Sequence, residues 1–342
     1  MKSNQKNKIL ILGGTAFVGR QLVEDLSNDP SIELYLFNRG KTNAHLFPNA
    51  HRIIGDRETK DIEQLRQHQW DYIIDFSSYF PKSLSNTLAV INRDIKRYIY
   101  ISTISVYDFP KYDGKSKIEE TFHRNPYTET QVVAPSFKEN YGEKKAACED
   151  ILAAATWLPA IILRPSVIYG KYDPTDRFYY WLRKIKKEKH LLVPSNGKLL
   201  STLSYSEDLV DLLKACLTGV VANGTYNCTT HQPKTLLSIL ELMKELLNST
   251  CQLELVEGTW LRQEGVKIDQ DLPLWYGGNL MVSNEKLCKQ LPFKFRTFKE
   301  SVQSSIAYYE SENWRLCEAG MSDEREVALL AKRNVKENEI QK

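Results

Sequence analysis

The sequence predicts an α/β fold in which a doubly wound parallel sheet is followed by a smaller mixed C-terminal domain. Short apolar runs alternate with helical patterns through the first half of the chain, and this alternation is typical of parallel strands joined by helices. A glycine-rich segment lies between the first apolar run and the first helix. Right-handed crossovers then place a ligand site at the carboxyl ends of the strands.

The elements of this sheet follow in order along the chain. The expected strands cover residues 9–12, 33–37, 52–54, 72–76, 98–102 and 160–163. The expected helices cover residues 17–28, 58–68, 82–93 and 141–157. The first strand has four apolar residues and no polar break, as expected of a strand buried on both faces.

From about residue 171 the regular alternation of apolar runs and helical patterns ends. Asn-Gly at 195–197 predicts a hairpin turn, and residues 258–282 form a long loop that we expect to cover a site. The other expected elements are a basic helix at 177–189, helices at 206–218 and 235–248, a strand at 224–227 and a charged helix over the last twenty residues.

Composition and charge limit the classes of function. The 342 residues are 42% hydrophobic and 26% charged, with a net charge of +3, so a general affinity for nucleic acid is not expected. No apolar run is long enough to span a membrane, and the first one is too short for a signal peptide. The six cysteines and six histidines show no metal-ligand spacing, which predicts a cytoplasmic protein with reduced cysteines and no metal.

The opening segment, KILILGGTAFVGRQLVEDL, has the properties of a phosphate-binding turn. Gly13 suits a tight turn, Gly19 would let the helix lie close to the strand, and the helix N-terminus favours a pyrophosphate. Ala16 stands where the usual pattern has its middle glycine, and we expect one extra methyl group to be tolerated. An ordinary strand-to-helix turn is the alternative.

The end of the second strand bears on which dinucleotide would bind. Asn38 is neutral, and Arg39 and Lys41 are cationic, which favours NADP(H) over NAD(H) because cations attract a 2′-phosphate. Two solvated surface charges are the alternative. Asp56 is placed to accept a hydrogen bond from the adenine amino group, or to serve as a turn aspartate beside Gly55.

A tyrosine four residues before a lysine on one helix can act as a proton donor and acceptor, because the cation lowers the pKa of the phenol. The spacing occurs three times, at Tyr107/Lys111, Tyr141/Lys145 and Tyr180/Lys184. Pro110 opposes a helix after the first tyrosine, and the third pair lies beyond the sheet. We therefore choose Tyr141 and Lys145. The fifth strand ends with three candidate hydroxyl groups, those of Ser102, Thr103 and Ser105.

The motifs GGTAFVG, STISVY, YGEKK and RPSVIYG occur in this order. Over residues 8–170, and more weakly to about 230, the chain resembles the extended, atypical short-chain dehydrogenase/reductase family of NAD(P)-dependent epimerases, dehydratases and reductases. It is most similar to the branch that includes chloroplast proteins described as stem-loop RNA-binding. The resemblance implies that Thr103 is the catalytic hydroxyl, Tyr141 the acid/base and Lys145 its partner, and that flanking helices could form a homodimer.

The resemblance also implies that two different parts of the chain bind the cofactor and the substrate. A Rossmann domain at 1–170, to which the chain returns at about 201–230, would bind NAD(P), and most of 171–342 would bind substrate. The residues expected to line the cofactor are Gly13, Thr15, Ala16, Phe17, Val18, Gly19, Asn38, Arg39, Lys41, Asp56, Arg57, Phe76, Ser102, Pro165 and Val167.

Departures from the family pattern narrow the reactions and substrates that we expect for this chain. Ile104 and Ser105 replace the Asp-Glu pair that dehydratases place after the threonine, so we disfavour dehydration. Val167 replaces an asparagine and Ser201 an arginine that grip nucleotide sugars in epimerases, which argues against a standard nucleotide-sugar substrate.

One cation of the basic helix is a candidate substrate contact. Asp173 is expected to cap this helix, with Pro174 in its first position, which would place Arg177 near the helix start and the cleft. A solvated basic face is the alternative for the other cations.

Taken together, these features predict an oxidoreductase that reduces a carbonyl, or epimerises through a ketone, on a sugar-like or other small polar substrate. An RNA-binding protein on the same scaffold is the first alternative, although no aromatic residues interleave the lysines in an RNA-binding pattern. A cofactor-bound regulator without turnover is the second.

Overall fold

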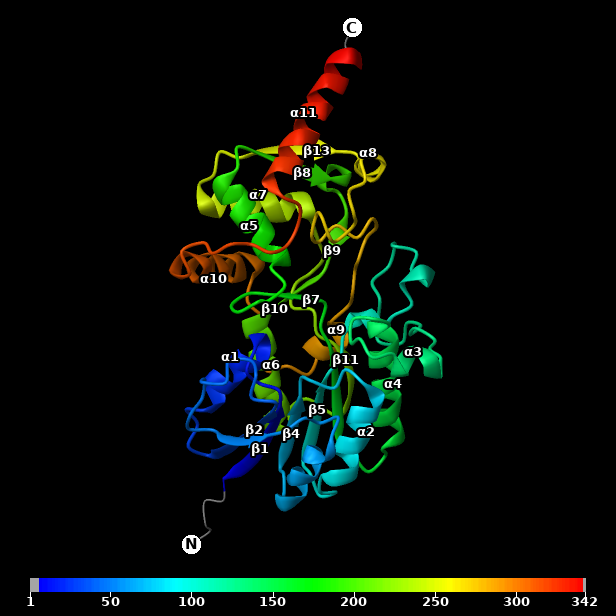
Figure 1. Cartoon of the computed structure of the whole chain (residues 1–342), viewed down its shortest axis with the longest axis vertical. Coiled ribbons are helices and arrows are strands. Elements are labelled where there is room, and N and C mark those ends of the chain that lie inside the picture. Colours follow the sequence, from blue (N-terminus) through cyan, green and yellow to red (C-terminus); the bar gives the residue numbers. More distant parts are fainter. Residues whose placement is uncertain (1–5, 341–342) are drawn as a thin grey trace.

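The computed structural model describes residues 6–340 and is built on one seven-stranded parallel sheet (Figure 1). The strand order is β11-β6-β5-β4-β1-β2-β3. The strands are β1 (Asn7–Leu12), β2 (Ile32–Asn38), β3 (His51–Ile54), β4 (Tyr72–Asp75), β5 (Arg97–Ile101), β6 (Ala160–Arg164) and β11 (Gly224–Asn227). The predicted doubly wound sheet is therefore confirmed, and the strand predicted at 224–227 is its edge strand beside β6.

Helices cover both faces of this sheet because the central strands are apolar on both sides. Ile9 and Ile11 of β1 share one hydrophobic cluster with α1 (Phe17–Leu26) and α6 (Ser206–Thr218). Leu10 and Leu12 share another with α2 (Pro81–Val90) and α4 (Tyr141–Ala154) on the opposite face. The helix predicted at 58–68 is instead a 3-10 helix, η1 (Lys60–Gln67), which starts at the capping side chain of Thr59.

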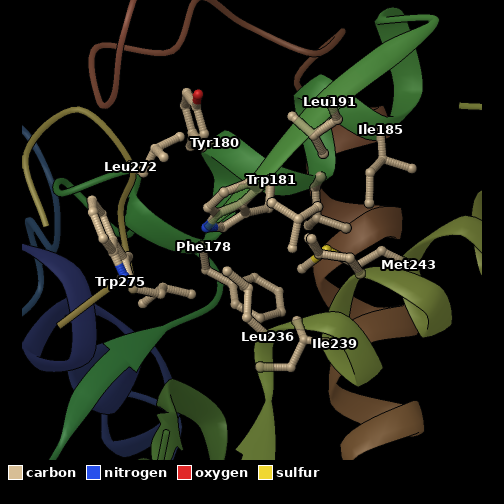
Figure 2. Packing of buried hydrophobic residues seen from close by; sticks show 14 of the residues in the cluster. Phe178, Tyr180, Trp181, Ile185, Leu191, Leu236, Ile239, Met243, Leu272 and Trp275 are labelled. Carbon is tan, nitrogen blue, oxygen red and sulfur yellow. The ribbon is translucent and has the colours of Figure 1, made fainter. Parts of the chain in front are cut away.

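A second lobe with its own core lies above the carboxyl ends of the strands (Figure 1). Figure 2 shows Trp181 of α5 in one cluster with Leu191 of β8 and Met243 of α7. The Trp181 indole N–H donates to the Pro273 carbonyl at 2.9 Å. The main elements of this lobe are α5 (Arg177–Lys187), β8 (His190–Pro194), α7 (Leu236–Leu247), β13 (Gln252–Val256), α8 (Gly258–Gln263), α10 (Phe298–Ser311) and α11 (Asp323–Ile340).

The hairpin predicted at 195–197 is wrong. Asn196 and Gly197 do adopt positive φ, of 52° and 67°, as their turn signal indicates, but they form a 3-10 turn, η4 (Ser195–Gly197). The flanking strands pair elsewhere: β8 pairs in parallel with β13, and β9 (Leu200–Ser201) pairs antiparallel with β12 (Lys234–Thr235). The buried apolar run of β8 decides this, because it must face the core that α5 and α7 build.

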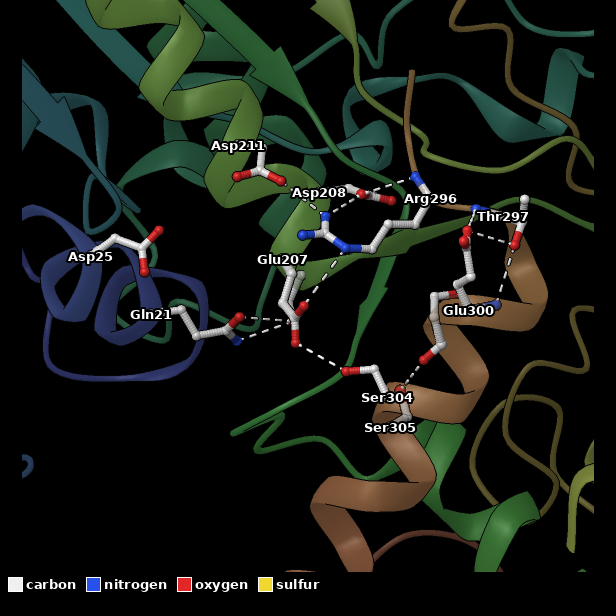
Figure 3. Close-up of polar contacts among 12 residues, drawn as sticks. Gln21, Asp25, Glu207, Asp208, Asp211, Arg296, Thr297, Glu300, Ser304 and Ser305 are labelled. Atoms are coloured by element: carbon white, nitrogen blue, oxygen red, sulfur yellow. Dashed lines mark hydrogen bonds and ion pairs between the residues drawn. The ribbon is translucent and has the colours of Figure 1, made fainter. Parts of the chain in front are cut away.

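Two features join the lobes. A small parallel sheet of β7 (Val167–Tyr169) and β10 (Leu203–Tyr205) follows β6. In Figure 3, Arg296 just before α10 reaches α6, where its guanidinium lies 2.7 Å from Asp208 and 2.9 Å from Asp211. Ser304 of α10 donates to Glu207 of α6 at 3.2 Å. These contacts connect the sheet lobe directly to the second lobe. No helix among residues 6–340 is both long and apolar enough to cross a membrane.

Candidate functional site

A cavity of about 1660 Å³ lies at the carboxyl ends of the strands. Segments that follow β1, β2, β4 and β5 line it, together with residues of the second lobe such as Thr175 and Tyr276. Its volume exceeds the roughly 300–1,000 Å³ of a single-ligand pocket, so it has room for a cofactor and a substrate. Every residue that the sequence predicted for catalysis, cofactor or substrate lines this cavity.

The glycine-rich turn needs its glycines. Gly13 and Gly14 have φ of 102° and 84°, which L side chains rarely adopt. A Cβ on Gly19 would lie 3.0 Å from the Gly14 Cα, so this glycine lets α1 approach the strand end as predicted. Ala16 is extended, with φ of −138°, and precedes α1. Its extended backbone does not require glycine, so the conformation at this position is compatible with alanine.

The N-terminus of α1 is free to receive an anion. Ala16 provides no side-chain cap, so the first amide groups of the helix keep their hydrogen-bonding capacity beside the cavity. This uncapped end, together with the positive-φ glycines, fits the pyrophosphate of a dinucleotide.

The end of β2 presents two cations to the cavity. Arg39 and Lys41 are exposed and line it, and no ion pair to either is found within residues 6–340. The Asn38 amide is engaged locally, since it donates to the Gly13 carbonyl at 3.3 Å and accepts from the Gly40 amide at 2.9 Å. Asn38 therefore shapes the wall through its side chain, while the two cations remain available to a ligand.

Arg57 and Asp56 also have structural partners. The Arg57 guanidinium is buried and donates to both carboxylate oxygens of Asp75, at 2.9 and 3.2 Å. Burial alone would raise the pKa of Asp75, but the adjacent Arg57 outweighs it and holds that pKa at about 2. Asp56 accepts from the Glu58 amide at 3.0 Å, which makes it a turn aspartate that also lines the cavity. The sequence showed no sign of the partner Asp75.

The N-terminus of α4 brings Tyr141 to the end of β5. Gly142 makes this possible, because a Cβ there would lie 2.1 Å from the Ser105 carbonyl oxygen. The Thr103 hydroxyl interacts with the Tyr141 phenol and opposes the rise in its pKa, and Thr103 also contacts the Ser105 hydroxyl at 3.2 Å. The Ser102 hydroxyl instead donates to the buried Glu149 at 2.6 Å. Of the three predicted hydroxyl groups, Thr103 is thus the one that acts on the pKa of Tyr141.

Lys145 lies one helical turn after Tyr141, but the net pKa of Tyr141 is raised, not lowered as the spacing predicts. Burial raises the pKa of Tyr141 to about 12, against the opposing effects of the Thr103 hydrogen bond and the charge of Arg177. Burial also lowers the pKa of Lys145 to about 8, because no carboxylate pairs with it among the described residues. Its ammonium donates to the Ile101 carbonyl at 2.7 Å. The phenol therefore keeps its proton at neutral pH.

The lysines of the two rejected tyrosine–lysine pairs form ion pairs. The Tyr107 hydroxyl contacts Asn227 and Arg164 at 2.5 and 2.9 Å, and Lys111 pairs with Asp108. Lys184 forms ion pairs with Glu326 and Asp323 of α11.

Arg177 faces the cavity as the first residue of α5. The predicted cap is wrong in detail: Asp176, not Asp173, precedes the helix, and Pro174 is outside it. Asp173 instead accepts from the Thr175 amide at 2.8 Å. The predicted covering loop does line the cavity, through Asp269, Tyr276, Gly278, Asn279 and Leu280.

Three comparisons place this geometry among known proteins. The profile of the NAD dependent epimerase/dehydratase family matches residues 9–229. The dTDP-glucose 4,6-dehydratase 1 of Escherichia coli (strain K12) is 24% identical over 349 residues, covering 89% of this chain and 93% of that protein. The solved UDP-glucuronic acid 4-epimerase from Bacillus cereus in complex with NAD superimposes with a TM-score of 0.67 at 16% identity, covering 89% of this chain and 99% of that one.

A protein from the predicted branch of stem-loop binding proteins is also similar to this chain. The chloroplast stem-loop binding protein of 41 kDa b from Arabidopsis thaliana is 25% identical over 228 residues, which are 61% of this chain and 54% of that protein. The chain thus spans about half the length of that relative. The family match, the parallel sheet and the cavity at its carboxyl edge agree, and the chain belongs to the NAD dependent epimerase/dehydratase family.

Proposed function

We propose that this protein is an NAD(P)-dependent oxidoreductase that reduces a carbonyl group, or epimerises a carbon through a ketone, on a sugar-like or other small polar substrate. The supporting observation is that Tyr141, Thr103 and Lys145 line the same cavity as the glycine-rich turn. The sheet lobe would hold the cofactor, and residues of the second lobe would hold the substrate.

A nicotinamide cofactor, when bound, supplies or accepts the hydride. The chain itself supplies the proton chemistry. Since burial keeps the Tyr141 phenol protonated, its hydroxyl can donate a proton to a carbonyl oxygen as charge develops there. The Thr103 hydroxyl orients the same oxygen, and the Lys145 ammonium lies within the site to stabilise the phenolate that remains. A resting phenol suits the reductive direction.

We infer a preference for NADP(H) from the cations at the end of β2. Arg39 and Lys41 line the cavity with no ion-pair partner in the described part of the chain. Two unpaired cations attract a 2′-phosphate, whereas an NAD-specific site places a carboxylate on the ribose. The Bacillus cereus epimerase was solved with NAD, so this preference is where the chain would depart from it.

We also propose that the reaction is not a dehydration, although relatives include dehydratases. Elimination of water needs an acid and a base beside the reacting carbons. Ile104 and Ser105, which follow Thr103 and line the cavity, carry no carboxylate.

RNA binding is the second candidate, because one relative is a stem-loop binding protein. Lys186, Lys187 and Lys189 are exposed at the end of α5. Against this, Lys184 in the same helix is buried and ion-paired. RNA affinity that falls steeply with salt would favour this candidate.

A fluorescence titration with NADPH and NADH tests the proposal. Wild type should bind NADPH more tightly than NADH, and Arg39→Ala should weaken NADPH alone, by about tenfold for the loss of one charged hydrogen bond. Equal binding of the two cofactors would contradict the preference, and binding of neither would contradict the enzyme proposal. Arg66→Ala, an exposed arginine outside the cavity, is the matched control.

A further inference from the structure

The substrate end of the cavity is built from three polar side chains of the second lobe. Arg177 begins α5, and Asp269 and Tyr276 lie on the loop after α8. A guanidinium nitrogen of Arg177 lies 3.6 Å from an Asp269 oxygen. The loop holds Asp269 in place, because its other oxygen accepts from the Leu274 amide at 3.0 Å.

This cluster lies near the proposed acid. The charge of Arg177 acts on the pKa of Tyr141 and on those of Asp269 and Tyr276. The Tyr276 hydroxyl is buried and has no hydrogen-bond partner within residues 6–340. A buried hydroxyl without a partner is costly, so a group that enters this end of the cavity would gain a hydrogen bond from it.

The charge at this end is already balanced. The basic residues that line the whole cavity are Arg39, Lys41, Arg57, Lys145 and Arg177. Arg39 and Lys41 follow β2, Arg57 is paired with Asp75, and Lys145 lies beside Tyr141. Arg177 is therefore the cation of this lobe at the cavity, and Asp269 is its counter-ion.

The helix that carries Arg177 offers no second anion site. The N-terminus of a helix ordinarily attracts anions, but Asp173 and Asp176 already lie at the start of α5. Asp176 is ion-paired with Arg315, and Asp173 accepts from Thr175. A diphosphate here would meet carboxylates instead of free amide groups.

We propose that Asp269 neutralises Arg177 and thereby makes the substrate end selective for an uncharged hydroxylated group over a phosphorylated one. Asp269 would accept from hydroxyl groups of the substrate, and Arg177 and Tyr276 would donate to its oxygens. A diphosphate would have to displace Asp269 and leave a carboxylate unpaired in a half-buried site, which is unfavourable. This proposal rests on the proposed function, because it takes the same cavity as a substrate site.

The test is a calorimetric titration of UDP into protein saturated with NADPH, so that the cofactor turn is occupied. Wild type should bind UDP weakly. Asp269→Asn keeps the acceptor for Leu274 but frees the guanidinium, and we expect UDP to bind at least about tenfold more tightly. The double variant Asp269→Asn, Arg177→Met should lose this gain.

Asp271→Asn is the matched control, since Asp271 lies on the same loop, pairs with Arg325 and does not line the cavity. It should bind UDP like wild type. Tight UDP binding by wild type, or no gain in Asp269→Asn with unchanged melting temperature, would overturn the proposal.

The titration measures UDP binding alone, so its result can be interpreted even if the protein does not catalyse the proposed reaction. If neither NADPH nor NADH binds, the proposed function fails by itself. The difference between wild type and Asp269→Asn is then measured on the cofactor-free protein, where the double variant separates binding at Arg177 from binding at the glycine-rich turn.

Discussion

The helices α4 and α5 carry the same pattern, a tyrosine followed four residues later by a buried lysine, in opposite electrostatic surroundings. Lys145 of α4 has no carboxylate partner in the described part of the chain, and burial lowers its pKa to about 8. Lys184 of α5 contacts Glu326 and Asp323, and these carboxylates outweigh burial and raise its pKa. A buried cation kept without a counter-ion costs stability, which is typical of a functional site, whereas a paired one holds elements together.

The tyrosines differ in the same way. Tyr141 lines the cavity together with Thr103, which opposes the rise in its pKa, while the Tyr180 hydroxyl is buried without a partner among the described residues. The spacing of a tyrosine and a lysine along a helix therefore identifies candidate catalytic pairs. Counter-ions and access to a cavity decide which candidate can act in a site.

The largest expected effect is on turnover. Tyr141→Phe should lower kcat by about 10²–10⁴-fold, because the proton donor is lost, while the affinity for NADPH and the melting temperature stay close to wild type. The measurement is NADPH oxidation with a carbonyl substrate that wild type reduces. Tyr180→Phe is the control and should keep wild-type turnover; equal losses in both variants would remove the distinction between the helices.

The next effect is on stability, and here α5 should be the sensitive helix. Lys184→Met leaves Glu326 buried without its cation and should lower the free energy of unfolding by about 3–5 kcal/mol. Lys145→Met removes a cation that has no carboxylate partner and should leave the stability at pH 7 unchanged or raise it. Urea unfolding of both variants checks this, and a larger loss in Lys145→Met would contradict it.

The two lysines should also respond differently to pH. The lowered pKa of Lys145 means that the unfolded chain binds more protons than the folded one between pH 8 and the ordinary lysine pKa. Relative to Lys145→Met, the stability of wild type should therefore rise in this window, by at most about 1.4 kcal/mol per pH unit. Lys184 has a raised pKa, so its contribution is full below the ordinary lysine pKa and is lost only as pH rises through its higher folded value.

The lowered pKa of Lys145 also predicts how turnover depends on pH. Turnover should fall above about pH 8 as the Lys145 ammonium loses its proton. Unfolding curves and rates at pH 7, 8 and 9 provide both measurements, and a flat difference in stability between wild type and Lys145→Met would refute the assignment.

The smallest effect concerns two tyrosine hydroxyl groups without partners. Tyr180→Phe and Tyr276→Phe should each raise the free energy of unfolding by about 1 kcal/mol, because each removes a buried unpaired hydroxyl. Since Tyr276 lines the cavity and Tyr180 does not, only Tyr276→Phe should raise KM for the carbonyl substrate. An unchanged KM would remove Tyr276 from the substrate site.

The sequence by itself determined the sheet, the glycine-rich turn and the order of the motifs. These features are local: an apolar run, a glycine that must take a positive φ, as at Gly13, and a helix start at Tyr141 each leave a mark in a few neighbouring residues. For that reason the predicted strands agree with the structure, and the predicted site residues lie around one cavity.

Only the tertiary structure decided which groups neutralise one another. Asp75 holds Arg57, Asp269 faces Arg177 and Glu326 pairs with Lys184, across separations in sequence that no local pattern encodes. The pairing of β8 with β13 and the raised pKa of Tyr141 depend in the same way on what packs against each element. Burial and counter-ions are properties of the folded surroundings, and they separate the tyrosine and lysine at the cavity from their counterparts in the core.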